Sequence, residues 1–161
     1  MTGATFITTA DSGIFGVRDL ANKTVGVVEG TTTERALADH LKSQGVTANV
    51  RTLSTYDLAI SMLSSGRLDA LAGDRDLLTG LGMRSENAAK LRLTSQLFTY
   101  EPYALPLPRN DADFRLQVNR SLAQVYQSGE VGRIWQKWFG SMNLQPTREL
   151  LMLYRLNSLP E

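Results

Sequence analysis

A short run of β-branched residues followed by a glycine and three threonines constrains this chain more than any other feature. Residues 24–28, Thr-Val-Gly-Val-Val, have the pattern of a buried strand, and Gly30 ends it. After the threonines at 31–33, Leu37 and Leu41 stand four positions apart, as on one face of a helix. The stretch therefore predicts a strand, a glycine turn, a hydroxyl-rich loop and a helix start.

The start of that helix is a candidate anion site. The first N–H groups of a helix have no partner within the helix, and the helix dipole gives this end a partial positive charge. A carboxylate suits such an end, and the hydroxyls of Thr31 and Thr32 can add hydrogen bonds. The same residues also fit a simple helix cap, in which a threonine side chain accepts a backbone hydrogen bond. Both interpretations stay open on these residues alone.

Alternation of strand and helix patterns continues to about residue 81. Strands are predicted at 5–9, 24–28, 48–53 and 68–72, and helices at 33–43, about 56–65 and 75–81. A capping box is predicted at 54–57, and Leu58, Met62 and Leu63 are expected to face inward. Strand-helix-strand order predicts right-handed crossovers, so we expect an α/β fold with a mainly parallel sheet.

The pattern changes near residue 97. Residues 97–107 are expected to be extended because Pro102 and Pro106 oppose a helix. Asp111 is expected to cap a long helix, a second helix ends at Gly140, and a last helix starts at Pro146–Thr147. The expected apolar faces of these helices are Phe114, Val118, Leu122 and Val125, then Val131, Ile134, Trp135 and Trp138, then Leu150, Leu151 and Tyr154.

Composition excludes several function classes. With 17 Lys and Arg against 16 Asp and Glu, no nucleic-acid partner is expected. The chain has no cysteine and a single histidine, His40, so no metal site, histidine triad or cofactor is predicted. No catalytic carboxylate pair is visible. No apolar run approaches the roughly 20 residues of a membrane span, and residues 1–5 lack the pattern of an export leader.

Five motifs stand in an order and at a spacing that resemble one family. They are Lys23-Thr24-Val25-Gly26-Val27 with Gly30-Thr31-Thr32, Ser65-Gly66-Arg67-Leu68-Asp69-Ala70, Gly73-Asp74, Gly129-Glu130 and Lys137-Trp138-Phe139-Gly140. The chain resembles the extracytoplasmic (periplasmic) solute-binding proteins of polar amino acid ABC transporters, family 3, especially the glutamate/aspartate-binding group. The resemblance implies a type II periplasmic-binding-protein fold, a periplasmic location and a transporter permease as partner.

The resemblance covers only the later part of such proteins, which have two lobes joined by two hinge strands. It implies a hinge strand at 1–9, the second α/β lobe at 10–97, a return hinge at 98–109, and helices of an incomplete first lobe at 110–161. The chain is therefore expected to be truncated at its N-terminal side. We expect the apolar faces of 110–161 to associate with another copy of the chain, with domain swapping as one route to a homo-oligomer.

The resemblance also implies a ligand site. Gly30, Thr31 and Thr32 are expected to donate hydrogen bonds to a carboxylate, and Asp74 is expected to accept from the α-ammonium of an amino acid. Glutamate, aspartate and their amides are the candidates. Relatives that bind acidic ligands often place a histidine near the position of Leu58, so the preferred amino acid stays open. For Asp74 the alternative interpretation is a helix cap.

Other functions are considered beside amino acid binding. The same fold hosts cyclic-acid dehydratases, which place an acid or base in the cleft between lobes. It also serves receptors, and a truncated chain that binds nothing is a further alternative. An amino-acid-binding component of a transporter, without enzymatic activity, is the leading hypothesis.

Overall fold

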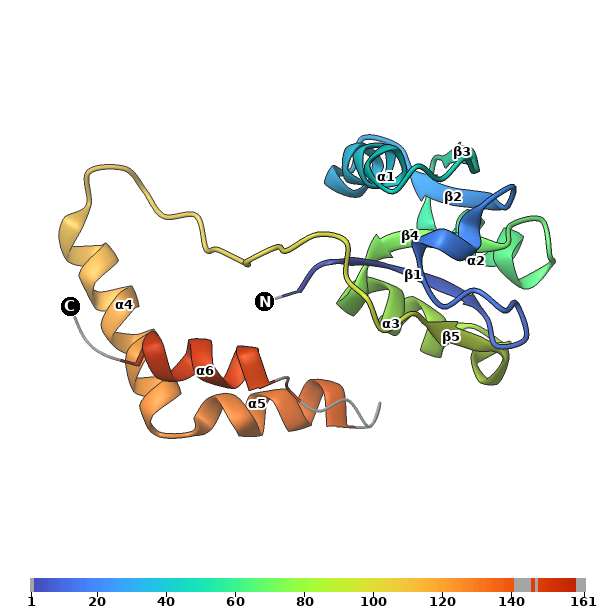
Figure 1. Cartoon of the computed structure of the whole chain (residues 1–161). Helices are drawn as coiled ribbons and strands as arrows, with labels where there is room; N and C mark the ends of the chain where they lie inside the picture. The colour runs from blue at the N-terminus through green and yellow to red at the C-terminus, as the bar shows by residue number, and fades with distance from the viewer. Residues whose placement is uncertain (1, 141–145, 147, 159–161) are drawn as a thin grey trace. The chain divides into compact units, whose positions relative to one another are not determined.

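The computed structural model describes residues 2–140, 146 and 148–158. The chain forms two compact units, Met1–Tyr103 and Ala104–Glu161, each described below by itself (Figure 1). The predicted boundaries after residues 9, 97 and 109 stay predictions, although the border between the units falls inside the predicted return hinge.

The first unit is built on one five-stranded sheet with the strand order β3-β2-β4-β1-β5 (Figure 1). Its strands are β1 (Ala4–Thr9), β2 (Thr24–Val28), β3 (Asn49–Leu53), β4 (Ala70–Asp74) and β5 (Leu91–Leu93). β2 pairs in parallel with β3 and β4, as predicted, whereas β1 pairs antiparallel with β4 and β5.

The predicted α/β class is confirmed, but the sheet is mixed rather than mainly parallel. The reason is β1, which the sequence placed in a hinge and which inserts between β4 and β5. Its residues 4–6 are almost completely buried, as expected for a strand in the middle of a sheet.

Three helices cover the two faces of this sheet. Helix α1 (Thr32–Ser43) packs on one face, where its Leu37 and Leu41 join Val25, Val27 and Phe6 in one buried cluster. Helices α2 (Tyr56–Ser64) and α3 (Arg75–Arg84) cover the other face, where Leu63 and Leu78 join Ile7 and Leu71. Neighbouring residues such as Phe6 and Ile7 belong to opposite clusters because side chains alternate along a strand.

Gly26 shows how closely the second face is packed. A Cβ atom at this position would lie 2.6 Å from Cδ1 of Leu68 and 3.2 Å from Cδ1 of Leu53. A larger residue would have to displace these leucine side chains, which accounts for a glycine in the middle of an otherwise β-branched run.

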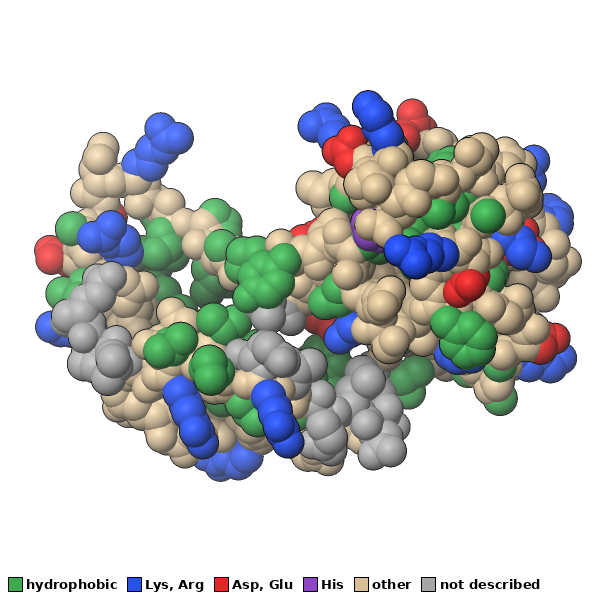
Figure 2. Space-filling view, in the orientation of Figure 1, with side chains coloured by type: hydrophobic (Ala, Val, Ile, Leu, Met, Phe, Trp, Pro, Cys, Tyr) green, Lys and Arg blue, Asp and Glu red, His purple; other side chains and the backbone are tan. Residues whose placement is uncertain are grey.

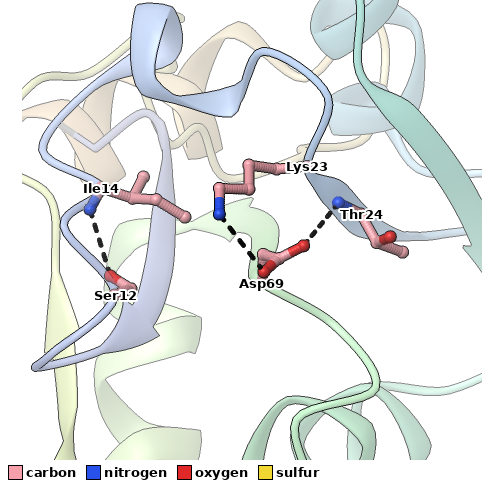
Figure 3. A network of polar contacts seen from close by, with 5 residues as sticks. All are labelled: Ser12, Ile14, Lys23, Thr24 and Asp69. Atoms are coloured by element: carbon pink, nitrogen blue, oxygen red, sulfur yellow. Dashed lines mark hydrogen bonds and ion pairs between the residues drawn. The ribbon is translucent and has the colours of Figure 1, made fainter.

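Asp69 ties the beginnings of β2 and β4 together (Figure 3). Its carboxylate accepts a hydrogen bond of 2.7 Å from the Thr24 N–H and lies 4.0 Å from Nζ of Lys23. The Asp69 N–H in turn donates to the Thr24 carbonyl at 2.9 Å. Asp69 of the Ser65–Ala70 motif thus has a structural role at the amino end of the strands.

The second unit contains α4 (Ala112–Gln127), α5 (Glu130–Phe139) and α6 (Arg148–Leu156). Asp111 caps α4 as predicted, because its carboxylate accepts from the Phe114 N–H at 2.9 Å. Gly140 follows α5 as predicted. The predicted start of the last helix includes Thr147, which lies outside the described residues. Association through these helices stays a prediction.

One residue of the predicted inward face of α2, Leu58, is wrong. Leu58 is 42% exposed, whereas Ala59, Met62 and Leu63 are buried. The helix cap is Thr55, whose hydroxyl accepts from the Leu58 N–H at 3.3 Å, rather than Ser54. Positions 59, 62 and 63 share one side of a helix, and Leu58 lies beside that stripe.

Candidate functional site

The predicted site residues lie at the carboxyl ends of two adjacent parallel strands. Val25 of β2 is opposite Ala70 of β4, so three residues further on Val28 and Gly73 reach the same edge of the sheet. The chain leaves β2 toward α1 on one face and leaves β4 toward α3 on the other. Such a divergence opens a crevice at which α/β proteins bind ligands.

The loop after β2 brings Gly30, Thr31 and Glu34 together. Gly30 has a φ of +73°, which favours glycine, and its N–H donates to Oε2 of Glu34 at 2.9 Å. The Thr31 hydroxyl donates to the Val28 carbonyl at 2.7 Å and accepts from the Glu34 N–H at 3.3 Å. Thr31 is therefore the helix cap, and a carboxylate of the chain itself already occupies one N–H of the predicted anion site.

Thr32 differs from its two neighbours in the loop. It is the first residue of α1 and is exposed to solvent. The first N–H groups of a helix have no partner within the helix, and the exposed Thr32 adds a hydroxyl donor beside them. Of the three predicted loop residues, Thr32 is thus the best placed to meet an added carboxylate.

Asp74 ends β4 and caps α3. Its Oδ1 accepts from the N–H groups of Asp76 at 2.9 Å and Leu77 at 3.1 Å, and Tyr103 donates its hydroxyl to the same oxygen at 3.4 Å. The cap interpretation is therefore correct, and it does not remove Asp74 from the site. A helix cap at a sheet edge holds its carboxylate in one fixed position beside the crevice.

The electrostatic neighbours of this region are Tyr56, Tyr103, Asp76 and Glu101, and of these the sequence indicates Asp76 alone, as a second candidate to accept from the ammonium. Partial burial, followed by the charge of Asp74, raises the pKa of Tyr56 above 10.0, and the same two causes raise the pKa of Tyr103 to about 12. Burial and then Asp74 also raise the pKa of Asp76 above 3.8. Glu101 acts on both tyrosines and contributes to raising their pKa values. The sequence signal for this concentration of negative charge is the presence of two aspartates, Asp74 and Asp76, at the start of one helix.

Two hollows of the first unit lie elsewhere. One of about 500 Å³ is lined by Phe15–Asp19, Gln44, Ser95 and Gln96, and one of about 360 Å³ continues it past His40 and Phe98. Neither includes Gly30, Thr31, Thr32 or Asp74, so the candidate site is distinct from both hollows.

His40 is not simply a solvated side chain. Its ring stacks on Phe98 with centroids 5.2 Å apart, and Phe98 stacks on Phe6 at 4.9 Å. Partial burial lowers the pKa of His40. Among the described residues, no three His, Cys, Asp or Glu side chains gather as around a metal ion. Within the described helices, none combines the length and apolarity that crossing a membrane requires.

Comparison with known proteins gives a consistent set of relatives. The family model described as NMT1/THI5 like matches residues 2–95. The L-glutamate/L-aspartate-binding protein of Pseudomonas aeruginosa is 30% identical over 121 residues, which are 75% of this chain and 40% of that protein. The glutamate/aspartate import solute-binding protein of Salmonella typhimurium is 29% identical over 157 residues, which are 96% of this chain and 51% of that protein.

A solved structure agrees with these relatives. The polar amino acid ABC uptake transporter substrate binding protein from Streptococcus thermophilus superposes with a TM-score of 0.67 at 26% identity, over 96% of this chain and 58% of that one. The predicted resemblance and the binding-protein fold are thereby confirmed. The chain spans about half the length, or less, of the curated relatives named here.

Proposed function

Since this chain belongs to the NMT1/THI5-like family, we propose that it is the amino-acid-binding component, or part of that component, of an ABC transporter. It binds a polar amino acid non-covalently, works in the periplasm and delivers its ligand to a transporter permease. The observation that carries the proposal is the juxtaposition of the Gly30–Thr32 loop and Asp74 at one edge of the sheet. An anion site and a carboxylate on neighbouring strands suit the two charges of an amino acid.

In this proposal each side of the crevice has one task. The N–H groups at the start of α1 and the Thr32 hydroxyl donate to the ligand's carboxylate. Asp74 accepts from the ammonium through its carboxylate, which the α3 cap keeps in place. No bond of the ligand is broken. The named relatives are binding proteins, which supports this non-enzymatic role over a dehydratase-like enzyme.

Titration calorimetry of the whole chain with common amino acids tests the proposal. Replacing Asp74 by alanine is expected to weaken binding by about 2 kcal/mol or more, because the ammonium loses its charged partner. Asp74→Asn separates the two roles of this residue, since asparagine caps a helix as well as aspartate does but carries no charge. It is expected to keep the stability of the wild type and to lose affinity.

Asp39→Asn is the matched control, because Asp39 is exposed on α1. Unchanged affinity in both Asp74 variants would remove Asp74 from the site. Saturable heat is expected for binding. Heat that continues while an added compound is consumed would instead favour the dehydratase-like enzyme.

A further inference from the structure

The two hollows of the first unit form one groove because they share part of their lining. The shared lining residues are Gly16, Val17, Gln44 and Gln96. His40 and Phe98 line only the smaller part, and the whole is named the His40 groove below. Its two parts, of about 360 Å³ and about 500 Å³, have the size of small-molecule sites.

Aromatic rings form one wall of the smaller part of the groove. The His40 ring stacks on Phe98 with an angle of 18° between the ring planes, and Phe98 stacks on Phe6. His40 is one end of this three-ring stack, and its half-buried ring also lines the groove. Partial burial lowers the pKa of His40, so the imidazole is neutral at slightly alkaline pH. A neutral ring at the end of a stack is a surface on which a further planar ring can stack.

Two glutamine side chains supply hydrogen-bonding groups to both parts of the groove. Gln44 follows the last residue of α1, and Gln96 lies in the segment after β5. Both residues are exposed, and neither side-chain amide has a hydrogen-bond partner within the part of the chain that the structure describes. Each amide offers a donor and an acceptor side by side, which is the arrangement that binds the edge of a base such as adenine.

The backbone at Gly16 leaves room for one of these amides. Gly16 is extended, with a φ of −164°, so its backbone conformation does not require glycine. A Cβ atom there would nevertheless lie 3.1 Å from Oε1 of Gln96, closer than an ordinary contact. Glycine at this position therefore lets the Gln96 side chain lie against the backbone of the groove. Arg18 and Asp19, which line the larger part, carry opposite charges, so the groove favours neither sign of charge.

We propose that the His40 groove is a second small-molecule site, which binds a neutral planar heterocycle of the purine-base type. The ring stacks on His40, and the amides of Gln44 and Gln96 bond to the donors and acceptors at its edge. This site is separate from the proposed amino acid site, because none of the residues assigned to that site lines the groove.

Nuclear magnetic resonance of the whole chain with adenine tests the proposal. His40 is the only histidine, so its imidazole proton signals report this groove alone. At a fixed pH of about 8, where the imidazole is neutral, adenine is expected to shift these signals upfield in a saturable way, because a stacked ring shields them. Purine, which lacks the amino group of adenine, is expected to bind about fivefold more weakly because one edge hydrogen bond is lost.

Variants measured by calorimetry separate stacking from edge recognition. His40→Leu removes the stacking face and is expected to weaken adenine binding about tenfold. Gln44→Ala is expected to weaken adenine binding about fivefold, because the edge of the base loses a partner. Asp39→Asn, at the exposed position next to His40 in α1, is the matched control and is expected to keep the wild-type affinity.

The outcomes decide this proposal independently of the proposed function. His40 signals that stay unshifted up to the solubility limit of adenine would overturn it, and so would wild-type affinity in the His40→Leu variant. Binding of adenosine monophosphate without binding of adenosine would indicate a phosphate site and would also overturn it. Saturable shifts with adenine in a chain that binds no amino acid would support the second site and overturn only the proposed function.

Discussion

Both units of this chain contain capped, amphipathic helices, but the units differ in how far the apolar side chains of those helices are buried. In the first unit, two clusters of buried residues lie on either side of a sheet. In the second, Ala123 and Leu150 are the buried hydrophobic residues among those the structure describes. Large apolar side chains are exposed on all three of its helices: Phe114, Ile134, Trp138, Leu151, Met152 and Leu156.

Exposed apolar side chains are not confined to either unit. Figure 2 shows charged and hydrophobic side chains on the visible surface of both units. An amphipathic period predicts that a helix forms and which face is apolar. It does not predict how much of that face is buried by other parts of the protein. The position of a helix can therefore be predicted where the burial of its side chains cannot.

The largest expected effect compares one deletion in each unit. Leu63 of α2 is completely buried, so Leu63→Ala is expected to lower the free energy of unfolding by about 3 kcal/mol. Leu122 in α4 is only half-buried, so Leu122→Ala is expected to lower the free energy of unfolding by about 1 kcal/mol. Urea unfolding measures both.

The probes for that experiment are already in the chain. Trp135 and Trp138 are its two tryptophans and both belong to the second unit, so their fluorescence reports this unit. Circular dichroism and amide exchange of β1, β2 and β4 report the first unit. Equal costs for Leu63→Ala and Leu122→Ala would show that the two units are equally well packed.

Helix caps provide a smaller and better matched comparison. Thr55 caps α2 and Asp111 caps α4, each through one side-chain bond to a backbone N–H. Thr55→Ala and Asp111→Ala are each expected to lower the stability of the helix that the residue caps by about 1 kcal/mol. Only Thr55→Ala is expected to shift the cooperative unfolding of the first unit. A shift of that transition by Asp111→Ala would show that the two units unfold together.

The smallest expected effect concerns Asp76 and pH. Because its folded pKa is raised above 3.8, ionised Asp76 reduces stability, and the loss develops as the pH rises through the folded pKa. Asp76→Asn is therefore expected to stabilise the first unit at pH 7 by less than about 1 kcal/mol, as for a partly exposed charge. The gain should disappear below pH 3.8, whereas Asp113→Asn in α4 should leave this transition unchanged at either pH. Thermal unfolding at pH 3 and pH 7 measures this.

Local elements were predictable because their causes are local. The β-branched run of β2, the Gly30 turn, the Asp111 cap and the end of α5 each depend on a few neighbouring residues. The predicted Thr31 and Asp74 positions also follow from turns at strand ends. The hydrogen bond from Tyr103 to Asp74 did not follow, because Tyr103 stands 29 residues further along the chain.

The sheet could be predicted only in part for the same reason. Strands that alternate with helices predict parallel pairing, and β2 and β4 do pair in parallel. β5 has three residues and no distinctive pattern, so the sequence predicts no strand there. Nothing local indicates that residues 4–9 run antiparallel between β4 and β5. The bond from the Gly30 N–H to Glu34 is again local, because Glu34 stands four residues after Gly30 in the first turn of α1.

The central place of β1 has a consequence for how the chain acquires its structure over time. The Ala4 N–H donates to a hydroxyl 95 residues further along, at Thr99, and every strand partner of β1 is made much later during synthesis. Folding dominated by such distant contacts is slow. Until β4 emerges, β1 is a strand with two free edges, and such a strand invites pairing with other chains. Of the five strands of this sheet, β1 is thus made first and is among the last to be paired.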